Sequence, residues 1–291
     1  MIQKKKISVI IPNYNYARYL DQSIQSVLEQ SYDNLELIVV NNGSTDNSLE
    51  ILEKYKHKIR LINQPNLGQS GARNSGLSLA SGELIAFLDA DDFWEPTKLE
   101  MQSVLIHDDT QLVYCGILPF KDSENENLSS VLPRYKGHCA SYFTDFPGAS
   151  IVLSGESTAL FSRDLLLKVG LFDAELNSTA GWDFFRRCSR LTNFDFVSVP
   201  LVNYRLHASN MSNSNNDVIL DMRRAYSKLF NDIDWSIPKK KEIAISRALE
   251  WSYLKTYLRT YDIKSVVTSG INLLKLISKS YKSHPLEVLG Q

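Results

Sequence analysis

The chain has 291 residues, of which 43% are hydrophobic and 22% charged, as expected for a globular protein of one large or two modest domains. Its 32 basic and 33 acidic residues leave a net charge of −1, so no overall field would attract nucleic acid. The three cysteines are widely spaced, which argues against a disulfide framework or a zinc site and favours a reducing, cytoplasmic setting. No apolar run approaches the ~18 residues of a membrane span, so we expect at most peripheral contact with the inner face of a membrane.

The first 117 residues alternate short apolar runs with segments of helical periodicity. The apolar runs predict strands at 7–11, 35–40, 59–62, 84–88 and 112–117. Helices are expected at 20–28, behind the start signal at 44–46, at 71–80, and at 97–107 with Pro96 as the first helical residue. Strands that alternate with helices predict βαβ units, and therefore an α/β fold with a mainly parallel sheet flanked by helices.

The chain is less regular between residues 118 and 217. Residues 121–130 are polar and acidic, which predicts a loop within a short excursion at 119–150. We expect short helices at 162–170 and 184–191, an extended segment at 196–202, and a loop rich in Asn and Ser at 209–217. This pattern predicts a first domain over 1–215 that divides near residue 117.

The last part of the chain, 216–291, is predicted to be helical. From about Val218 its apolar residues recur with helical spacing, and lysines and arginines stand between them. Such a region packs on the core as an appendage, forms a homodimer face, or lies on a membrane surface, because basic amphipathic helices do all three. The sequence leaves these three roles open.

An acidic turn follows the expected strand at 84–88. Asp89, Asp91 and Asp92 stand within four residues, and the strand would carry them to the sheet edge at which ligands of α/β proteins bind. Close carboxylates repel one another, and a hard cation such as Mg²⁺ or Mn²⁺ relieves that repulsion because it prefers carboxylate oxygen. The alternative is a solvated acidic turn that caps the next helix.

Three further polar clusters stand at 10–15, 39–46 and 66–76. The first is a turn that bears Tyr14, and the second offers amides and hydroxyls suited to hydrogen bonds with a base and a ribose. The third combines glycines and a helix start with Arg73, and both features suit a phosphate group. Taken alone, each cluster is explained equally well by a turn, a helix cap or a packing glycine.

Together and in this order, the segments resemble family 2 glycosyltransferases of the GT-A fold. The family's usual motifs read S-V-I-I-P-x-Y-N, V-D-D-G-S-T-D, N-x-G-x-x-x-A-R-N-x-G and L-D-x-D-D. The corresponding segments of this chain are 8–15, 40–46, 66–76 and 88–92. The resemblance implies a nucleotide-binding half at 1–117, an acceptor-binding half at 118–215, and a divalent metal on Asp91 or Asp92 of the D-x-D motif. It places a nucleotide-sugar donor against Pro12, Tyr14, Asn15, Asn42, Ser44, Gly68, Arg73, Asp89, Ala90, Asp91 and His207.

His207 enters this set through a fifth match. The segment at 204–212 resembles the family's Y-R-x-H-x-x-N-M-S, which implies that His207 touches the diphosphate or the metal and that Arg205 braces it. A purely structural histidine is the alternative.

The match weakens at the catalytic base. An inverting transferase needs a carboxylate that takes the proton from the acceptor hydroxyl, and the family's segment reads roughly G-x-F-D-x-x-x-x-x-x-E-D-W-D. In this chain the E-D positions hold Ala180 and Gly181, and Asp183 alone remains of that acidic set. We take Asp183 as the first candidate base and Glu156 as the second; the alternative for Asp183 is a helix cap.

The donor base is left open by a second departure. Asn41 and Asn42 stand where the family has an acidic pair. An asparagine oxygen accepts a hydrogen bond from a pyrimidine N3–H, so uridine and thymidine donors fit, and guanosine stays possible.

The sequence therefore predicts a metal-dependent inverting transferase that moves a sugar to a hydroxyl of a glycan or lipid-linked acceptor. Cell-surface polysaccharide or glycoconjugate synthesis is the setting that the resemblance implies. One rival is a nucleotidyltransferase, although such enzymes carry a glycine-rich basic loop where this chain has 12–15. The other is a catalytically impaired relative that binds the nucleotide sugar. A dinucleotide-binding oxidoreductase is disfavoured because no GxGxxG follows a strand.

Overall fold

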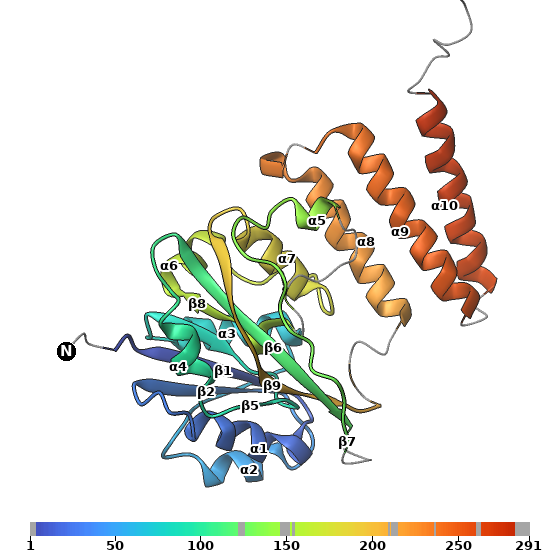
Figure 1. Cartoon of the computed structure of the whole chain (residues 1–291). Coiled ribbons are helices and arrows are strands. Elements are labelled where there is room, and N and C mark those ends of the chain that lie inside the picture. Colours follow the sequence, from blue (N-terminus) through green and yellow to red (C-terminus); the bar gives the residue numbers. More distant parts are fainter. Residues whose placement is uncertain are drawn as a thin grey trace, which may run out of the picture. The chain divides into compact units, whose positions relative to one another are not determined.

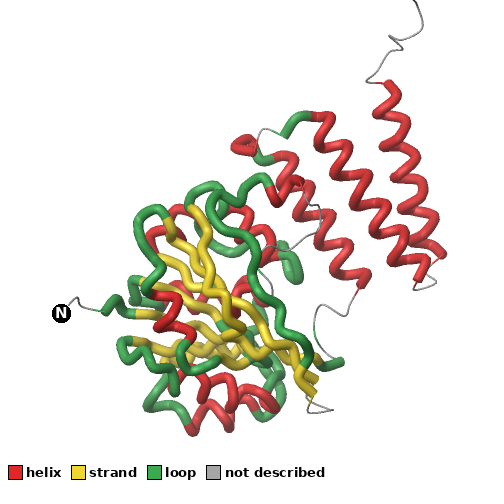
Figure 2. The backbone as a smooth tube through the Cα atoms, in the orientation of Figure 1, coloured by secondary structure: helices red, strands yellow, loops and turns green. Residues whose placement is uncertain are grey.

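The computed structural model describes residues 4–121, 126–145, 152, 155–208, 210, 215–235, 237–259 and 263–282. Parts of the loops expected at 121–130 and 209–217, and the end of the helical region expected at 216–291, lie outside these ranges. The chain forms two compact units: Met1–Ala140 with Ser150–Asn213, and Ser141–Ala149 with Ser214–Gln291. The strands described all belong to the first unit, and the second is helical (Figures 1 and 2).

The first unit is built around one mixed sheet of strand order β3-β2-β1-β4-β8-β6-β9-β5, with β7 paired to β6. The strands are β1 (Ile7–Asn13), β2 (Leu35–Asn42), β3 (Arg60–Gln64), β4 (Leu84–Phe87), β5 (Phe93–Trp94), β6 (Thr110–Lys121), β7 (Glu126–Asn127), β8 (Leu160–Ser162) and β9 (Asn193–Leu206). The expected parallel pairing holds across β3-β2-β1-β4 and between β6 and β9. β5, β7 and β8 pair antiparallel, so the half beyond β4 is mixed.

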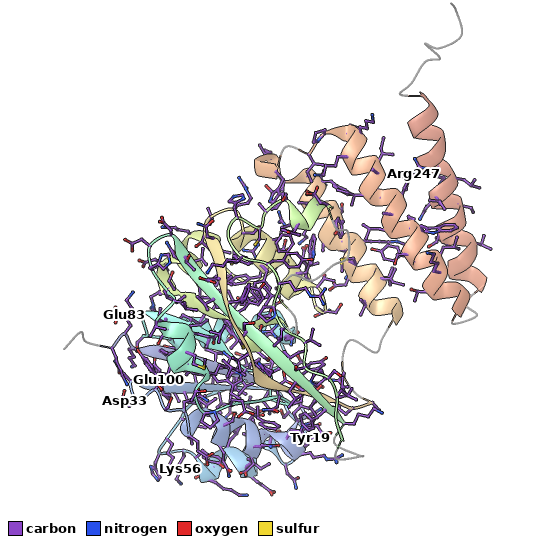
Figure 3. All side chains as sticks on the ribbon, viewed as in Figure 1. Tyr19, Asp33, Lys56, Glu83, Glu100 and Arg247 are labelled. Atoms are coloured by element: carbon purple, nitrogen blue, oxygen red, sulfur yellow. The ribbon has the colours of Figure 1, made fainter. Side chains whose placement is uncertain are left out.

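Helices flank this sheet. They are α1 (Ala17–Leu28), α2 (Ser48–Lys54), α3 (Gly68–Leu79), α4 (Lys98–Ser103), α6 (Arg163–Val169) and α7 (Ala180–Cys188). The central strands are apolar on both faces because both faces are covered, and Ile7, Val9 and Ile11 have no exposed surface. Helix α3 lies so close to β1 that a Cβ at Gly76 would come within 2.3 Å of the Ile10 side chain. Charged side chains such as Asp33, Lys56 and Glu83 are exposed and point away from the sheet (Figure 3).

Several element boundaries differ from the prediction. Pro96 precedes α4 instead of opening it, because its carbonyl accepts a hydrogen bond from the Ser31 amide. The helix expected at 184–191 begins earlier, at Ala180, and the extended segment expected at 196–202 is the middle of the longer β9. The excursion at 119–150 is not all loop. It contains the end of β6, β7 and α5 (Tyr142–Asp145), since backbone pairing with β9 continues β6 as far as Lys121.

The second unit consists of α5 with α8 (Asn215–Asn231), α9 (Lys239–Arg259) and α10 (Ile263–Lys282). Buried side chains of α8 and α9, including Tyr226, Leu229 and Leu249, form its core. Arg223 donates to both carboxylate oxygens of Glu250 at 3.0 and 2.8 Å, and so ties α8 to α9. None of the helices described is long and apolar enough to cross a membrane.

Candidate functional site

The predicted polar clusters meet at one edge of the sheet. β1, β2 and β4 are parallel neighbours, so their carboxyl ends lie side by side, and Asn13 at the end of β1 stands opposite Asn41 of β2. The acidic turn follows β4 directly. This edge is where ligands bind in open α/β sheets.

A cavity of about 440 Å³ opens at this edge, a volume within the usual range for small-molecule sites. The cavity is lined by Pro12, Asn13, Tyr14, Asn15, Tyr16, Asn42, Asn66, Gly68, Gln69, Ala72 and Asn177. Five of the expected donor-contacting residues are therefore together, and Tyr14, which is 45% exposed, stands at the mouth. The other expected residues do not line this cavity: Ser44, Arg73, Asp89, Ala90, Asp91 and His207.

Ser44 and Asn15 join the loops that follow β1 and β2. The Ser44 hydroxyl accepts hydrogen bonds from the Asn13 side chain and the Asn15 amide, both at 3.1 Å. Asn15 adopts a left-handed conformation with φ of 59°, which asparagine tolerates better than most residues, and its Oδ1 accepts from the Thr45 amide at 2.8 Å. These contacts shape one wall of the cavity.

Asn42 has its hydrogen-bonding groups engaged within the protein. Its Oδ1 accepts from the Gln64 side chain at 2.8 Å and the Leu67 amide at 3.0 Å. Its Nδ2 donates to Asn66 and to the Gly68 carbonyl, both at 3.1 Å. An asparagine amide has two donors and an oxygen with two lone pairs, and these four contacts engage all of them, so this side chain holds the loop before α3.

Two other asparagines, Asn13 and Asn41, carry free acceptors. Oδ1 of Asn13 and Oδ1 of Asn41 are buried without a hydrogen-bond partner in the described part of the chain. A buried oxygen without a partner is unfavourable, and a ligand N–H would satisfy it. The sequence signal was present, because both residues lie in the motifs already identified.

Arg73 links two carboxylates below the cavity. Its side chain is 2% exposed; Nη2 lies 2.8 Å from Asp89 Oδ1, and Nη1 lies 3.3 Å from Glu156 Oε1. Burial alone would lower the pKa of Arg73, but the charges of Glu156 and Asp89 outweigh it and raise the pKa. The guanidinium therefore stays charged and fixes both carboxylates.

Asp91 and Asp92 of the acidic turn are buried close to other carboxylates. Burial, followed by repulsion from Asp89, raises the pKa of Asp91, and burial with repulsion from Asp91 and Asp89 raises that of Asp92. Asp91 Oδ2 lies 3.0 Å from Nε2 of His207, and Asp92 Oδ1 accepts from the Arg205 amide at 3.1 Å. Ala90 is buried, and its carbonyl accepts from the Ser23 hydroxyl of α1 at 2.8 Å, which ties the acidic turn to α1.

The segment around His207 is brought back to this turn by β9. The His207 ring packs against Tyr16 and Tyr19 with centroid separations of 5.8 and 5.1 Å. Arg205 donates from Nε to the Asp91 carbonyl at 2.9 Å. The arginine thus supports the backbone of the acidic turn, and the histidine holds one of its carboxylates.

The carboxylates of the acidic turn suit a divalent cation whose remaining coordination positions are filled by a bound ligand. No group of three His, Cys, Asp or Glu side chains in the described ranges forms a ready metal cage. Asp92 Oδ2 is buried without a hydrogen-bond partner there, and the turn has more carboxylates than nearby cations to balance them. Mg²⁺-type sites commonly use one or two carboxylates together with substrate phosphates, which fits this arrangement.

Asp183, our first candidate base, is occupied elsewhere. It is 3% exposed on α7, with Oδ1 2.8 Å from Arg186 Nη2 and Oδ2 2.8 Å from Arg187 Nε. Arg187 also donates to the carbonyls of Val169 and Leu171. These contacts are those of a side chain that anchors a helix. Glu156, in contrast, lies beside Arg73 in the acidic site.

Residues 8–169, more than half of the chain, match the family model described as Glycosyl transferase family 2. The chain belongs to glycosyl transferase family 2. Among its relatives, the uncharacterized glycosyltransferase alr2836 of Nostoc sp. is 32% identical over 281 residues, which cover 90% of this chain and 86% of that protein. The uncharacterized glycosyltransferase RP339 of Rickettsia prowazekii is 29% identical over 296 residues, covering 97% and 90%.

Solved structures show that this family 2 glycosyltransferase has the GT-A fold. S. aureus TarS 1-349, in complex with UDP-GlcNAc, superposes with a TM-score of 0.62 at 19% identity, covering 91% of this chain and 90% of TarS 1-349. The mannosyltransferase PcManGT from Pyrobaculum calidifontis, in complex with GDP-Man and Mn²⁺, gives 0.61 at 17% identity, covering 97% and 83%. At these identities the likeness establishes the fold.

Proposed function

We propose that the protein is a metal-dependent, inverting transferase that uses a nucleoside-diphosphate sugar. The observation that carries the proposal is the pairing of a 440 Å³ cavity with a buried, under-neutralised acidic turn at the same sheet edge. A nucleoside diphosphate brings a base for the cavity and phosphates for a cation. The complexes of TarS with UDP-GlcNAc and of PcManGT with GDP-Man and Mn²⁺ support this choice.

In this proposal the nucleoside lies in the cavity, between Tyr14 at the mouth and the free acceptor of Asn13. That oxygen suits a base that presents an N–H group, so uridine, thymidine and guanosine donors all stay eligible. Asn42 would shape the cavity through the loop at 64–68 without reading the base.

The diphosphate would lie near the acidic turn, with Asp91 and Asp92 holding Mg²⁺ or Mn²⁺. Such an ion supplies positive charge for the diphosphate that leaves as the sugar is transferred. His207 would keep Asp91 oriented, and Arg73 would hold Asp89 in place beside it. The residues thereby stabilise negative charge at the place where it develops during the reaction.

The acceptor is proposed to be a hydroxyl of a glycan or of a lipid-linked sugar, as in synthesis of a cell-surface polysaccharide or glycoconjugate. Its oxygen attacks the anomeric carbon, the bond from that carbon to the diphosphate breaks, and a carboxylate of the protein takes the hydroxyl proton. Loss of the family's acidic pair at 180–181 also fits an impaired relative that binds the donor without turning it over. The test must separate these two cases.

The test is a donor screen with the purified full chain. Panels of UDP-, dTDP- and GDP-sugars are added with Mn²⁺, Mg²⁺ or EDTA, and thermal shift and released nucleoside diphosphate are measured. We expect one donor class to give a metal-dependent shift with slow nucleoside-diphosphate release, and Asp91→Asn to abolish both. Asp33→Asn, at an exposed carboxylate paired with Lys4, is the matched control.

Three results would contradict the proposal. Release of pyrophosphate would indicate a nucleotidyltransferase. A metal-dependent shift without any release, even with glycan and lipid-linked acceptors present, would indicate the impaired relative. No shift with any donor would exclude the nucleotide-sugar cavity itself.

We also propose that the second unit contacts an anionic membrane surface. On α10, Val267, Ile271 and Leu274 recur every three or four residues and are 54%, 47% and 67% exposed, which makes one apolar stripe. The sequence of α10 contains four lysines and no acidic residue. An exposed apolar stripe on a basic helix is typical of helices that lie in the lipid interface.

A further inference from the structure

The missing acidic pair has left a space that another carboxylate fills. Gly181 is the second residue of α7 and stands where the family has the aspartate of its E-D pair. A Cβ atom at position 181 would lie 2.7 Å from Oε1 of Glu156 and 3.0 Å from both its Cδ and its Oε2. The Glu156 carboxylate therefore occupies the volume into which a side chain at 181 would project.

Glu156 comes to this place from a different part of the chain. It lies in a short 3-10 turn, Gly155–Thr158, immediately before β8. The next residue, Ser157, accepts a hydrogen bond from the Asp89 amide at 3.1 Å, so the turn is fastened to the acidic loop. The turn thus brings Glu156 to the acidic loop from outside α7.

The surroundings of Glu156 suit proton transfer. The residue is 4% exposed, and its Oε1 has an ion pair with Arg73 but no hydrogen bond within the described residues. The charged groups that face it are Arg73 and Asp89; burial raises its pKa, Arg73 opposes that rise, and Asp89 adds to it. A carboxylate with a raised pKa is a stronger base near neutral pH.

We propose, on the basis of the transferase function above, that Glu156 is the catalytic base in place of the family's aspartate. Its carboxylate takes the proton of the acceptor hydroxyl while that oxygen bonds to the anomeric carbon. The bond from the anomeric carbon to the diphosphate breaks, and its electron pair leaves with the nucleoside diphosphate. Asp183 cannot substitute, because two residues along a helix turn the side chain by about 200°, to the opposite face from Gly181.

The first test needs no substrate: a double-mutant cycle of melting temperatures asks whether side chains at positions 156 and 181 occupy the same space. Gly181→Asp should lower the melting temperature because the new side chain meets the Glu156 carboxylate, and Glu156→Ala should relieve that loss in the double variant. Additive effects of the two substitutions would mean that the side chains do not share the space, and would overturn the proposal.

The catalytic role is tested by removing the carboxylate at position 156 and placing one at position 181, where the family has its aspartate. With the donor found in the screen, Glu156→Ala and Glu156→Gln should lower kcat about 10²–10⁴-fold with KM for the donor within about threefold. Adding Gly181→Asp to Glu156→Ala should recover at least about tenfold of that loss. Glu156→Gln keeps the side-chain volume, so it stays informative if the alanine variant folds poorly.

Asp183→Asn is the competing variant. We expect it to lower the melting temperature, since it weakens the contacts with Arg186 and Arg187, and to reduce kcat less than about tenfold. A larger loss of kcat in this variant than in Glu156→Gln would return the base to Asp183. A rise in KM at unchanged kcat in Glu156→Gln would make Glu156 a positioning residue that acts through Arg73. Absence of turnover in the wild-type protein would instead be a failure of the proposed function.

Discussion

At the scale of single residues, the site depends on a chain of charges, Asp89–Arg73–Glu156, in which Arg73 and Glu156 are buried. Removing one partner of a buried ion pair is costly, because the other charge then stays desolvated without compensation. The planar guanidinium contacts both carboxylates through different nitrogens, at 2.8 and 3.3 Å. An ammonium group is a single point of charge and cannot reproduce that fork.

We therefore expect Arg73→Lys to lower the free energy of unfolding by about 2–3 kcal/mol, although the charge is conserved. Urea denaturation measures this change. The matched control is Arg60→Lys, since Arg60 also pairs with a glutamate, Glu36, but is 46% exposed. Its effect should stay within about 0.5 kcal/mol. Equal effects of the two substitutions would show that the buried fork has no special role.

The motifs predicted which segments meet at one edge of the sheet, and the structure shows the contacts among them. The sequence predicted that Asn42 and Arg73 lie at the same edge of the sheet, because Asn42 ends a strand and Arg73 lies in the first half of a helix. It could not show that Asn42 is engaged by the loop at 64–68, or that Asn13 and Asn41 keep unpaired oxygens. Hydrogen-bond partners come from segments distant in sequence, and the spacing within one motif does not contain them.

At the scale of elements, α4 carries a charge into the core that its sequence does not reveal. Lys98 is fully buried, with Nζ 2.8 Å from Gln102 Oε1 and 4.0 Å from the centre of the Trp94 ring. Burial lowers the pKa of Lys98 from 10.5 to about 8, while the nearby Cys115 opposes that shift. A lysine in a helical segment normally lies on an exposed face, so the burial of Lys98 could not be predicted from its pattern.

This pKa makes the stability of the fold depend on pH. Between pH 8 and 10.5 the unfolded chain still holds the Lys98 proton that the folded protein has lost, so stability rises with pH in that window. From pH 7 to pH 10 the lysine should add about 2–3 kcal/mol, and Lys98→Met should lack this gain. Urea unfolding at the two pH values measures the difference.

Titrating groups that the wild-type protein and Lys98→Met share contribute equally to the pH dependence of both, so they cancel in the difference. Cys115, the nearest other titrating group, has a pKa raised to about 11 by burial and stays protonated at pH 10. Lys58→Met, at an exposed lysine, is the control and should keep the wild-type pH dependence. An identical pH dependence in Lys98→Met would show that the buried lysine keeps an ordinary pKa.

The two long paired strands show why element boundaries were missed. β6 and β9 pair in parallel as far as Lys121 and Leu206, beyond the apolar core. Apolar periodicity marks burial, and strand pairing continues where the backbones remain adjacent. The apolar centres of both strands were therefore predicted, whereas the end of β6 fell within the excursion expected at 119–150 and the ends of β9 were not predicted as strand.

At the scale of the whole molecule, charge is divided between the two parts of the chain. Residues 216–291 hold 13 basic and 8 acidic residues, a net charge of +5, whereas residues 1–215 hold 19 and 25, a net charge of −6. The overall value of −1 conceals this division. A basic part would be drawn to an anionic bilayer, and each lysine near such a surface contributes about 1 kcal/mol.

We expect the full chain to sediment with phosphatidylglycerol–phosphatidylcholine vesicles and not with phosphatidylcholine vesicles, and to be released by high salt. Replacing both Ile271 and Leu274 by Glu should weaken this binding at least about tenfold, because it removes apolar contact and adds negative charge. Val104→Glu, at a 77% exposed apolar residue of the first unit, should leave it unchanged. If the paired substitution instead splits a dimer seen by light scattering, and vesicle binding is absent from the start, the stripe on α10 is an interface between two copies of the chain.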